Sequence, residues 1–371
     1  MHIGHTYTHG IPVFLDPSAR ERHLYIIGAT GTGKTNLIEN MLATDIQAGE
    51  GVAFFDPHGD TAQRVIAHIP TQFRDKLAYF DFNSSRPIGL NFISDIPLQD
   101  RPRAAANIVS SVVHIFGEEA VAFRSQQVLR NSVRSLMDTS GGTLLCIPRL
   151  LRDAEYRAGI LRRGTDPVVL SYWRHTYDKY DDRRRAEVID PILNKLDAFL
   201  SFPKIRGIVG QTTNTIDLRK IIDERRILIV NINKGLIGEP ALLLACLLMS
   251  SLSHAAFSRS NISEEDRVPF YLYGDEFQNY SIPSMSDDLS ELRKYKLYFT
   301  LAHQFTAQIE DIVHKAIFAN VASLICFRVG ALDSPLLARH YEDNPDRLQN
   351  LANFTALLRP LINGAPGDPR F

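Results

Sequence analysis

A glycine-rich segment near the start of the chain has the residue types of a phosphate-binding loop. It matches G-x-x-x-x-G-K-T and consists of Gly28, Ala29, Thr30, Gly31, Thr32, Gly33, Lys34 and Thr35. Glycines let successive backbone N–H groups point at the β-phosphate of a nucleotide, and the start of a helix adds partial positive charge. Lys34 would reach the β- and γ-phosphates, and Thr35 would give its hydroxyl to Mg²⁺. A glycine-rich turn with a chance lysine is the alternative, but an apolar strand precedes this loop and a helical run follows it.

Two adjacent carboxylates follow an apolar strand-like run much later in the chain. Asp275 and Glu276 end the segment that reads FYLYGDE over residues 270–276. Asp275 would hold Mg²⁺ through a coordinated water, and Glu276 would orient or deprotonate the water that attacks the γ-phosphate. Strings of this kind are common on their own. Downstream of a phosphate loop, this one indicates ATP hydrolysis with Mg²⁺ as the cofactor.

Three further side chains are candidates for contact with the γ-phosphate. Gln304 ends the apolar run 297–304 and could sense this phosphate and align water, or it could be a polar strand terminus. Arg293 could reach the γ-phosphate of a neighbouring subunit, although a cation there would equally suit the C-terminal end of a helix. Arg328, at the end of the run 324–329, is a second candidate for this role.

Asp56 stands at the carboxyl end of another apolar run, 51–56, and begins the segment Asp56-Pro57-His58-Gly59-Asp60. Open α/β sheets bind ligands at this position, so Asp56 is a candidate for contact with the nucleotide. The alternative is a simple turn made by Pro57 and Gly59, with Asp60 capping the next helix. The residue types favour neither interpretation.

Apolar runs that do not alternate with polar residues predict strands that are covered on both faces, as in a parallel sheet between helices. These runs are 23–28, 51–56, 76–82, 226–233, 269–275, 297–303 and 323–329, and a helix is expected over 34–48. Residues 101–220 instead show mostly helical periodicity. We therefore expect an α/β core with a mostly parallel sheet, formed by residues 1–100 and 221–371, with an all-α insertion over 101–220.

The charge of the chain gives no global sign of a nucleic-acid partner, because the formal net charge is −1 over 371 residues. The predicted insertion is locally basic, with 20 Lys and Arg against 13 Asp and Glu. Tyrosines and Trp173 lie among the basic clusters 162–163 and 183–185, and such interleaving can bind nucleic acid. A solvated helical face with its aromatic side chains buried explains the pattern slightly better.

Cysteine usage and hydropathy predict a cytoplasmic protein. The three cysteines, Cys146, Cys246 and Cys326, are far apart and form no CxxC pair, which fits a reducing compartment. The longest apolar run, 241–257, is interrupted by serines and a histidine and follows a strand-like run. It favours a buried helix over a membrane span, so we expect no transmembrane segment in this chain.

Together these motifs resemble the FtsK–HerA superfamily of ring-forming motors, and most closely the TraG/TraD-type coupling ATPases of conjugation and type IV secretion. The matching strings are HLYIIGATGTGKT, GVAFFDPHGD, FYLYGDEFQ, LRKYKLYFTLAHQ and CFRVGALDS. The resemblance implies a RecA-like P-loop fold and a hexameric ring around a DNA-sized channel. It also implies ATP-driven movement of DNA, often single-stranded, with low sequence specificity. In such proteins the arginine at the position of Arg293 acts across the subunit interface, and the glutamine at that of Gln304 senses nucleotide.

The resemblance further implies a relaxase or secretion-channel partner, through which a cytoplasmic chain could associate with the inner membrane. Two other functions share the same nucleotide site. One is an ATPase that handles protein during secretion or pilus assembly. The other is a HerA-like ATPase that recruits a nuclease in repair or anti-phage defence.

Overall fold

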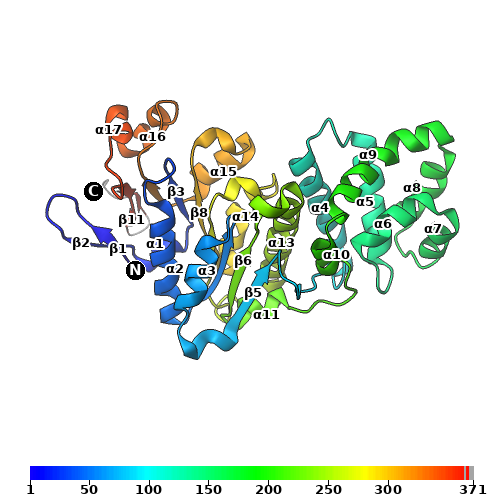
Figure 1. Ribbon diagram of the computed structural model, residues 1–371, viewed down its shortest axis with the longest axis horizontal. Helices are drawn as coiled ribbons and strands as arrows, with labels where there is room; N and C mark the ends of the chain where they lie inside the picture. The colour runs from blue at the N-terminus through cyan, green and yellow to red at the C-terminus, as the bar shows by residue number, and fades with distance from the viewer. Residues whose placement is uncertain (363–364, 367–371) are drawn as a thin grey trace. The chain divides into compact units, whose positions relative to one another are not determined.

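The computed structural model describes residues 1–362 and 365–366; the remaining residues of the last segment lie outside the described part. The chain forms two compact units: residues 1–80, 218–232 and 255–371 make the core unit, and residues 81–217 and 233–254 make the helical unit. The predicted insertion and the helical unit overlap over residues 101–217. Figure 1 traces the elements of both units by colour.

Within the described residues, the main sheet has eight strands in the order β10-β9-β3-β8-β7-β4-β6-β5. They are β3 (Leu24–Ile27), β4 (Gly51–Asp56), β5 (Leu77–Asp81), β6 (Ile227–Asn231), β7 (Phe270–Gly274), β8 (Leu297–His303), β9 (Ser323–Cys326) and β10 (Leu357–Arg359). Six neighbouring strands, from β9 to β6, run parallel, and β10 pairs antiparallel with β9. The predicted mostly parallel α/β core is confirmed.

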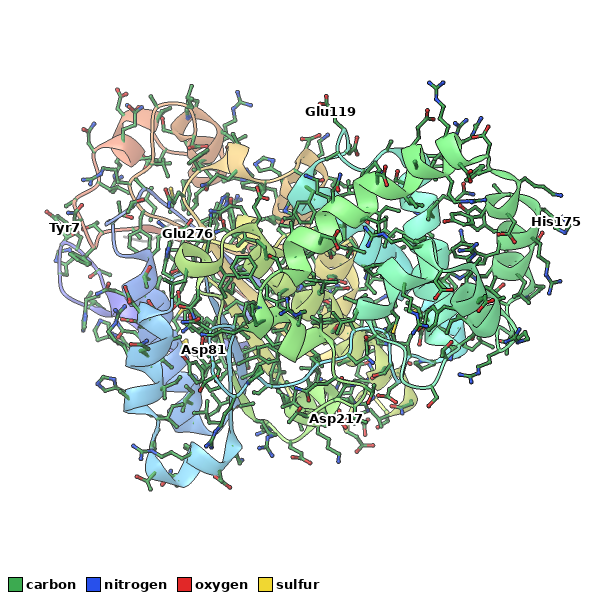
Figure 2. The ribbon with its side chains drawn as sticks, turned by 45° about the vertical axis from the view of Figure 1, so that its right-hand side comes forward. Tyr7, Asp81, Glu119, His175, Asp217 and Glu276 are labelled. Carbon is green, nitrogen blue, oxygen red and sulfur yellow. The ribbon has the colours of Figure 1, made fainter. Side chains whose placement is uncertain are left out.

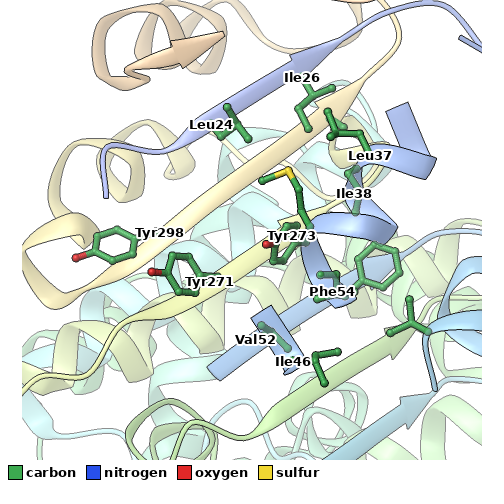
Figure 3. Close-up of a cluster of buried hydrophobic side chains, with 14 of the residues drawn as sticks. Leu24, Ile26, Leu37, Ile38, Ile46, Val52, Phe54, Tyr271, Tyr273 and Tyr298 are labelled. Carbon is green, nitrogen blue, oxygen red and sulfur yellow. The ribbon is translucent and has the colours of Figure 1, made fainter. Parts of the chain in front are cut away.

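The central strands are buried on both faces, as their uninterrupted apolar runs predict. Every residue of β3, β4, β6, β7 and β8 is buried. On one face, side chains such as Ile26, Phe54 and Tyr273 pack against helices α2 (Lys34–Ala48) and α3 (Asp60–His68), as Figure 3 shows for α2. On the other face, Tyr25 contacts Phe318 of α15 (Asp311–Asn320), with ring centroids 5.6 Å apart.

Helix α2 begins and ends where its glycines require. Gly33 precedes it with φ +120°, and Gly49 ends it in the left-handed conformation, with φ +77°. Its buried residues include Ile38, Met41 and Leu42, whose spacing of three and four residues places them on one face. The predicted range 34–48 matches the helix, and its first residues are the last two of the phosphate-loop motif.

A buried charge cluster fastens α2 to the sheet. The Arg20 guanidinium, at the end of α1 (Pro17–Arg20), donates to Asp45 of α2 with N–O distances of 2.8 and 2.5 Å. It also donates to the Tyr273 hydroxyl of β7 at 2.9 Å, and that hydroxyl donates to Asp45. The guanidinium stacks 3.9 Å from the centre of the Tyr271 ring. These contacts join α1, α2 and β7.

The remaining elements of the core unit are short. A hairpin at the start of the chain consists of β1 (His2–His5) and β2 (Pro12–Phe14), and β11 (Leu361–Ile362) pairs with β12 (Ala365–Pro366). The helices are α11 (Leu218–Asp223), α14 (Met285–Glu291), α16 (Ser334–Tyr341) and α17 (Pro345–Gln349).

The described residues of the helical unit contain no strand apart from Asp81, the last residue of β5. Its helices are α4 (Arg101–Phe116), α5 (Phe123–Met137), α6 (Ile147–Arg152), α7 (Ala154–Leu161), α8 (Pro167–His175), α9 (Asp182–Leu200), α10 (Pro203–Val209), α12 (Lys234–Ile237) and most of α13 (Glu239–Phe257). Figure 2 labels Asp81 and Asp217 at the ends of its main segment and His175 at the end of α8.

Three of the aromatic residues among the basic clusters of the helical unit, Tyr172, Trp173 and Tyr177, belong to its core, whereas Tyr156 and Tyr180 are half-buried. Trp173 and Tyr177 are fully buried, and the Trp173 indole donates to the Ser135 hydroxyl at 2.9 Å. Arg183 and Arg184 are exposed, and Arg183 pairs with Glu187. A solvated basic face over buried aromatic residues therefore describes this region.

One helix in the described residues, Glu239–Asn261, is long and apolar enough to cross a membrane by length and composition. Core helices of soluble proteins meet the same criteria, and 61% of its apolar window is buried in the structure.

Asp45→Asn should strongly destabilise the chain, because it leaves the Arg20 charge buried without a counter-charge. We expect the free energy of unfolding, measured by urea denaturation, to fall by about 3–5 kcal/mol. Glu187→Gln is the matched control, since it breaks an ion pair whose side chains are 90% and 61% exposed and should change stability by about 0.5 kcal/mol or less. Equal losses in the two variants would contradict a stabilising role for the cluster.

Candidate functional site

The backbone of the phosphate loop surrounds the side chain of Lys34. Lys34 is buried, and its ammonium group donates to the carbonyl oxygens of Gly28 and Ala29 at 2.6 and 3.2 Å. Gly31 and Gly33 have φ values of +76° and +120°, which L side chains rarely adopt. Burial lowers the pKa of Lys34, while the carboxylates of Glu276 and Asp275 act in the opposite direction. The loop therefore has a buried cation at its centre.

Segments from the second half of the chain hold the loop in place. Gly28 donates to the His303 carbonyl at 3.3 Å, and Ala29 donates to the Arg328 carbonyl at 2.7 Å. The backbone N–H of Phe354 donates to the Thr32 carbonyl at 2.7 Å. A Cβ atom on Gly28 would lie 2.5 Å from the Cβ of Phe327, so only glycine fits there without movement of the backbone.

Asp275 lies directly beside the loop. The Thr35 hydroxyl, at the start of α2, donates to its carboxylate at 2.9 Å. Burial raises the pKa of Asp275 to about 6, and the nearby Glu276 and Asp56 carboxylates act in the same direction, while Thr35 and Lys34 oppose them. A bound divalent cation would favour the charged form of this carboxylate. Hydroxyl and carboxylate oxygens are ligands that Mg²⁺ accepts, so Thr35 and Asp275 fit the predicted metal site.

Glu276 is held by two amides in an unusual backbone conformation. Its φ is +46°, in the left-handed region that non-glycine residues rarely occupy. One carboxylate oxygen accepts from Gln304 Nε2 at 2.9 Å, and the other accepts from Gln278 Nε2 at 2.7 Å. The candidate base and the candidate sensor are therefore in direct contact at the carboxyl ends of β7 and β8. Strain of this kind, at about 1–3 kcal/mol, is frequent at functional sites.

Asp56 lies near these carboxylates but bonds to its own loop. Its two oxygens accept from the backbone N–H groups of His58 and Ala62, at 3.0 and 2.8 Å, so it caps the start of α3. The side chain is buried and influences the pKa of Asp275. In this structure the capping contacts are direct, and nucleotide contact stays a prediction.

The two arginine candidates lie in different places. Arg328 is next to the loop, but its guanidinium donates away from it, to the Leu351 carbonyl at 3.2 Å and to Asn353 Oδ1 at 2.8 Å. Arg293 lies in the turn Leu292–Tyr295, which precedes β8, whereas Gln304 follows that strand. Arg293 is therefore at the amino ends of the parallel strands, whereas the phosphate loop of its own chain is at their carboxyl ends.

Around Arg293 is a basic cavity of about 410 Å³, which Arg22, Arg359 and His340 also line. Among the described residues, none of the three arginines has a side-chain hydrogen bond or ion pair. The position of Arg293 thus allows contact with an anion from outside the core unit.

No sequence motif indicates a role for Gln278 or Phe354 at the site. Gln278 follows Glu276 by two residues, and only its proximity to the carboxylate pair could have indicated a role. Phe354 is far from every motif, and the hydrogen bond from its backbone to Thr32 leaves no pattern in the sequence.

Comparison with solved structures shows the fold. The unbound bacterial conjugative coupling protein TrwBdeltaN70 superposes with a TM-score of 0.71 at 18% identity, over 99% of this chain and 88% of that chain. TrwB in complex with ADP and Mg²⁺ gives 0.69 at 17% identity over the same shares. VirB4 of Thermoanaerobacter pseudethanolicus gives 0.65 at 12% identity, over 99% of this chain and 94% of that chain. The predicted RecA-like P-loop fold is confirmed.

No curated protein matches the chain. A family model described as "Helicase HerA, central domain" matches residues 1–249, about two thirds of the sequence. The predicted relation to the FtsK–HerA superfamily is thereby confirmed, and the chain belongs to the family of the HerA helicase central domain.

Proposed function

We propose that this chain is an ATP-hydrolysing ring motor that moves DNA in conjugative transfer or type IV secretion. The observation that supports this most is the convergence of Lys34, Thr35, Asp275, Glu276 and Gln304 at one edge of the sheet. These are the groups that phosphoryl transfer to water needs: a cation, a metal site, a base and a γ-phosphate sensor.

ATP and Mg²⁺ are the proposed ligands of this edge. The triphosphate would take the place of the loop carbonyls as partner of the Lys34 ammonium, and Thr35 and Asp275 would hold Mg²⁺. The metal supplies positive charge that stabilises the negative charge on the phosphate oxygens. Two similar structures agree with these ligands, since TrwB has been solved with ADP and Mg²⁺ and with the ATP analogue ADPNP.

Glu276 is the proposed base for the attacking water. Loss of one of its two amide hydrogen bonds would free a further lone pair of this carboxylate for the water. Gln304, which follows β8 at the same edge, would exchange its bond to Glu276 for one to the γ-phosphate. This exchange would link the presence of ATP to the release of the base.

DNA is the proposed cargo, and a homohexamer the proposed assembly. TrwB is a bacterial conjugative coupling protein, and the likeness to it supports transport of DNA, with single strands as the first form to test. The exposed Arg183 and Arg184 give the helical unit cations for low-specificity contacts to phosphates. A relaxase or a secretion channel is the proposed partner.

Arg293 is proposed to act on the ATP of the neighbouring subunit. Within its own chain it lies across the sheet from the phosphate loop, so a contribution to hydrolysis requires a second copy of the chain. Such an arginine stabilises the charge that spreads over the γ-phosphate oxygens during transfer.

Lys34→Ala should abolish nucleotide binding. The substitution removes the only side-chain cation that the loop encloses among the described residues. Binding of a fluorescent ADP analogue with Mg²⁺ measures the effect, and Lys315→Ala is the control because Lys315 is exposed and pairs only with Asp311 in its own helix. Full ATPase activity in Lys34→Ala would remove the central claim.

The steady-state ATPase rate, measured with no DNA, with single-stranded DNA and with double-stranded DNA, tests the motor function. We expect stimulation by DNA, and a loss of roughly 10²–10⁴-fold in Glu276→Gln, which still binds ATP but lacks the base. Stimulation by one strand form identifies the form that the protein tracks. A rate that ignores DNA but rises with a protein partner would favour a protein-handling ATPase. Nuclease activity in a partner that depends on this chain would favour the HerA-like scaffold.

Mixing two inactive variants tests the role of Arg293 in trans. Arg293→Ala has an intact base, and Glu276→Gln has an intact arginine, so mixed rings contain some interfaces with both groups. We expect the ATPase rate of the mixture to exceed that of either variant alone. No recovery at any mixing ratio, in rings shown to exchange subunits, would argue for a helix-capping role instead.

A further inference from the structure

We propose that a second cavity, on the far side of the phosphate loop from the catalytic carboxylates, binds the purine base of the nucleotide by stacking on Phe354. The cavity has a volume of about 220 Å³ and is lined by Gly33, Asn36 and Asn40 of the loop and α2, and by Phe327, Phe354 and Leu358. This inference rests on the proposed ATP binding and names the part of the chain that would select the base.

The order of the strands fixes which end of the nucleotide faces the cavity. β3, which carries the phosphate loop, lies between β8 and β9. The groups for the γ-phosphate follow β7 and β8, on one side of β3. Ile325 of β9 and Leu358 of β10 line the cavity on the other side. A nucleotide that lies across the loop with its γ-phosphate at Glu276 must therefore direct its sugar and base toward the cavity.

The walls of the cavity suit a flat apolar ring. Phe327, Phe354, Leu358 and Ile325 are apolar, and the polar side chains of the lining are those of Asn36, Asn40 and His5. The lining residues of the described chain include no acidic side chain, so no carboxylate is present to select guanine by its N–H donors. Ligand pockets for drug-sized molecules have volumes of roughly 300–1,000 Å³, and this smaller space fits a single base.

Phe354 has two features that a structural role in the core does not explain. Its side chain is 70% exposed, although it is a large apolar ring. Its backbone has a φ of +61°, a strained conformation for an aromatic residue, and is fixed by the hydrogen bond to Thr32. Its ring is so close to the loop that a Cβ on Gly33 would lie 3.0 Å from Phe354 Cδ1. A strained aromatic residue that is tied to the loop and exposed at the cavity is placed to stack on a base.

Binding measurements with ligands that have or lack a base test this proposal. The affinities of ADP, GDP and pyrophosphate, each with Mg²⁺, are compared by calorimetry for the wild-type chain and for Phe354→Ala. We expect similar affinities of ADP and GDP, a loss of roughly tenfold to a hundredfold for both in the variant, and unchanged affinity for pyrophosphate. Phe354→Tyr should retain the wild-type values, and Leu332→Ala is the control because its side chain is 97% exposed.

A second variant keeps the test independent of Phe354. Ala356→Trp should fill the cavity, and it should weaken binding of ADP while pyrophosphate still binds. Equal affinities of ADP and pyrophosphate for the wild-type chain would overturn the base pocket while leaving the phosphate site intact, as would loss of both ligands to the same extent in both variants. Failure of all three ligands to bind the wild-type chain would overturn the proposed function itself.

Discussion

The parallel direction of β3, β8 and β7 is the constraint on which the site depends. Because these neighbouring strands end at the same edge of the sheet, residues separated by hundreds of positions in the sequence meet there. The hydrogen bond from Thr35 to Asp275 joins the element after β3 to the end of β7. The cluster of Arg20, Asp45 and Tyr273 joins the same two elements from within the core. Helix α2 and strand β7 are thus connected twice, once at the site through Thr35 and Asp275 and once in the core through the Arg20 cluster.

In this structure the charged groups of Lys34 and Glu276 have hydrogen-bond partners within the chain. The Lys34 ammonium bonds to loop carbonyls, and both oxygens of Glu276 bond to amides. Nucleotide binding would therefore replace hydrogen bonds within the chain by hydrogen bonds to the phosphates. Such an exchange has a small net free energy per bond, which makes the charges of the phosphates and of Mg²⁺ the larger contribution to affinity.

The parts of the fold that could be predicted from the sequence are those that a short, continuous stretch of residues specifies. The range of α2 and the strands around Phe54 and Tyr273 are evident because apolar runs and flanking glycines are read within a few residues. The residues of the loop and the Asp275–Glu276 pair are evident because their spacing follows from the chemistry. β10 has only three residues, and Gln278 and Phe354 act through contacts that no periodicity encodes. The pairing of Arg20 with Asp45 likewise joins residues that look like ordinary surface charges in the sequence.

The contacts that hold the phosphate loop have a consequence for the order in which the site is made during synthesis. The loop, residues 28–35, precedes in the sequence all three segments that hold it. Its backbone partners at His303, Arg328 and Phe354 are all translated later. A nascent chain that has released the whole motif from the ribosome still lacks the segments that hold the loop, so the complete set of loop contacts forms only after residue 354 has been translated. Synthesis of the motif therefore precedes formation of the complete loop structure.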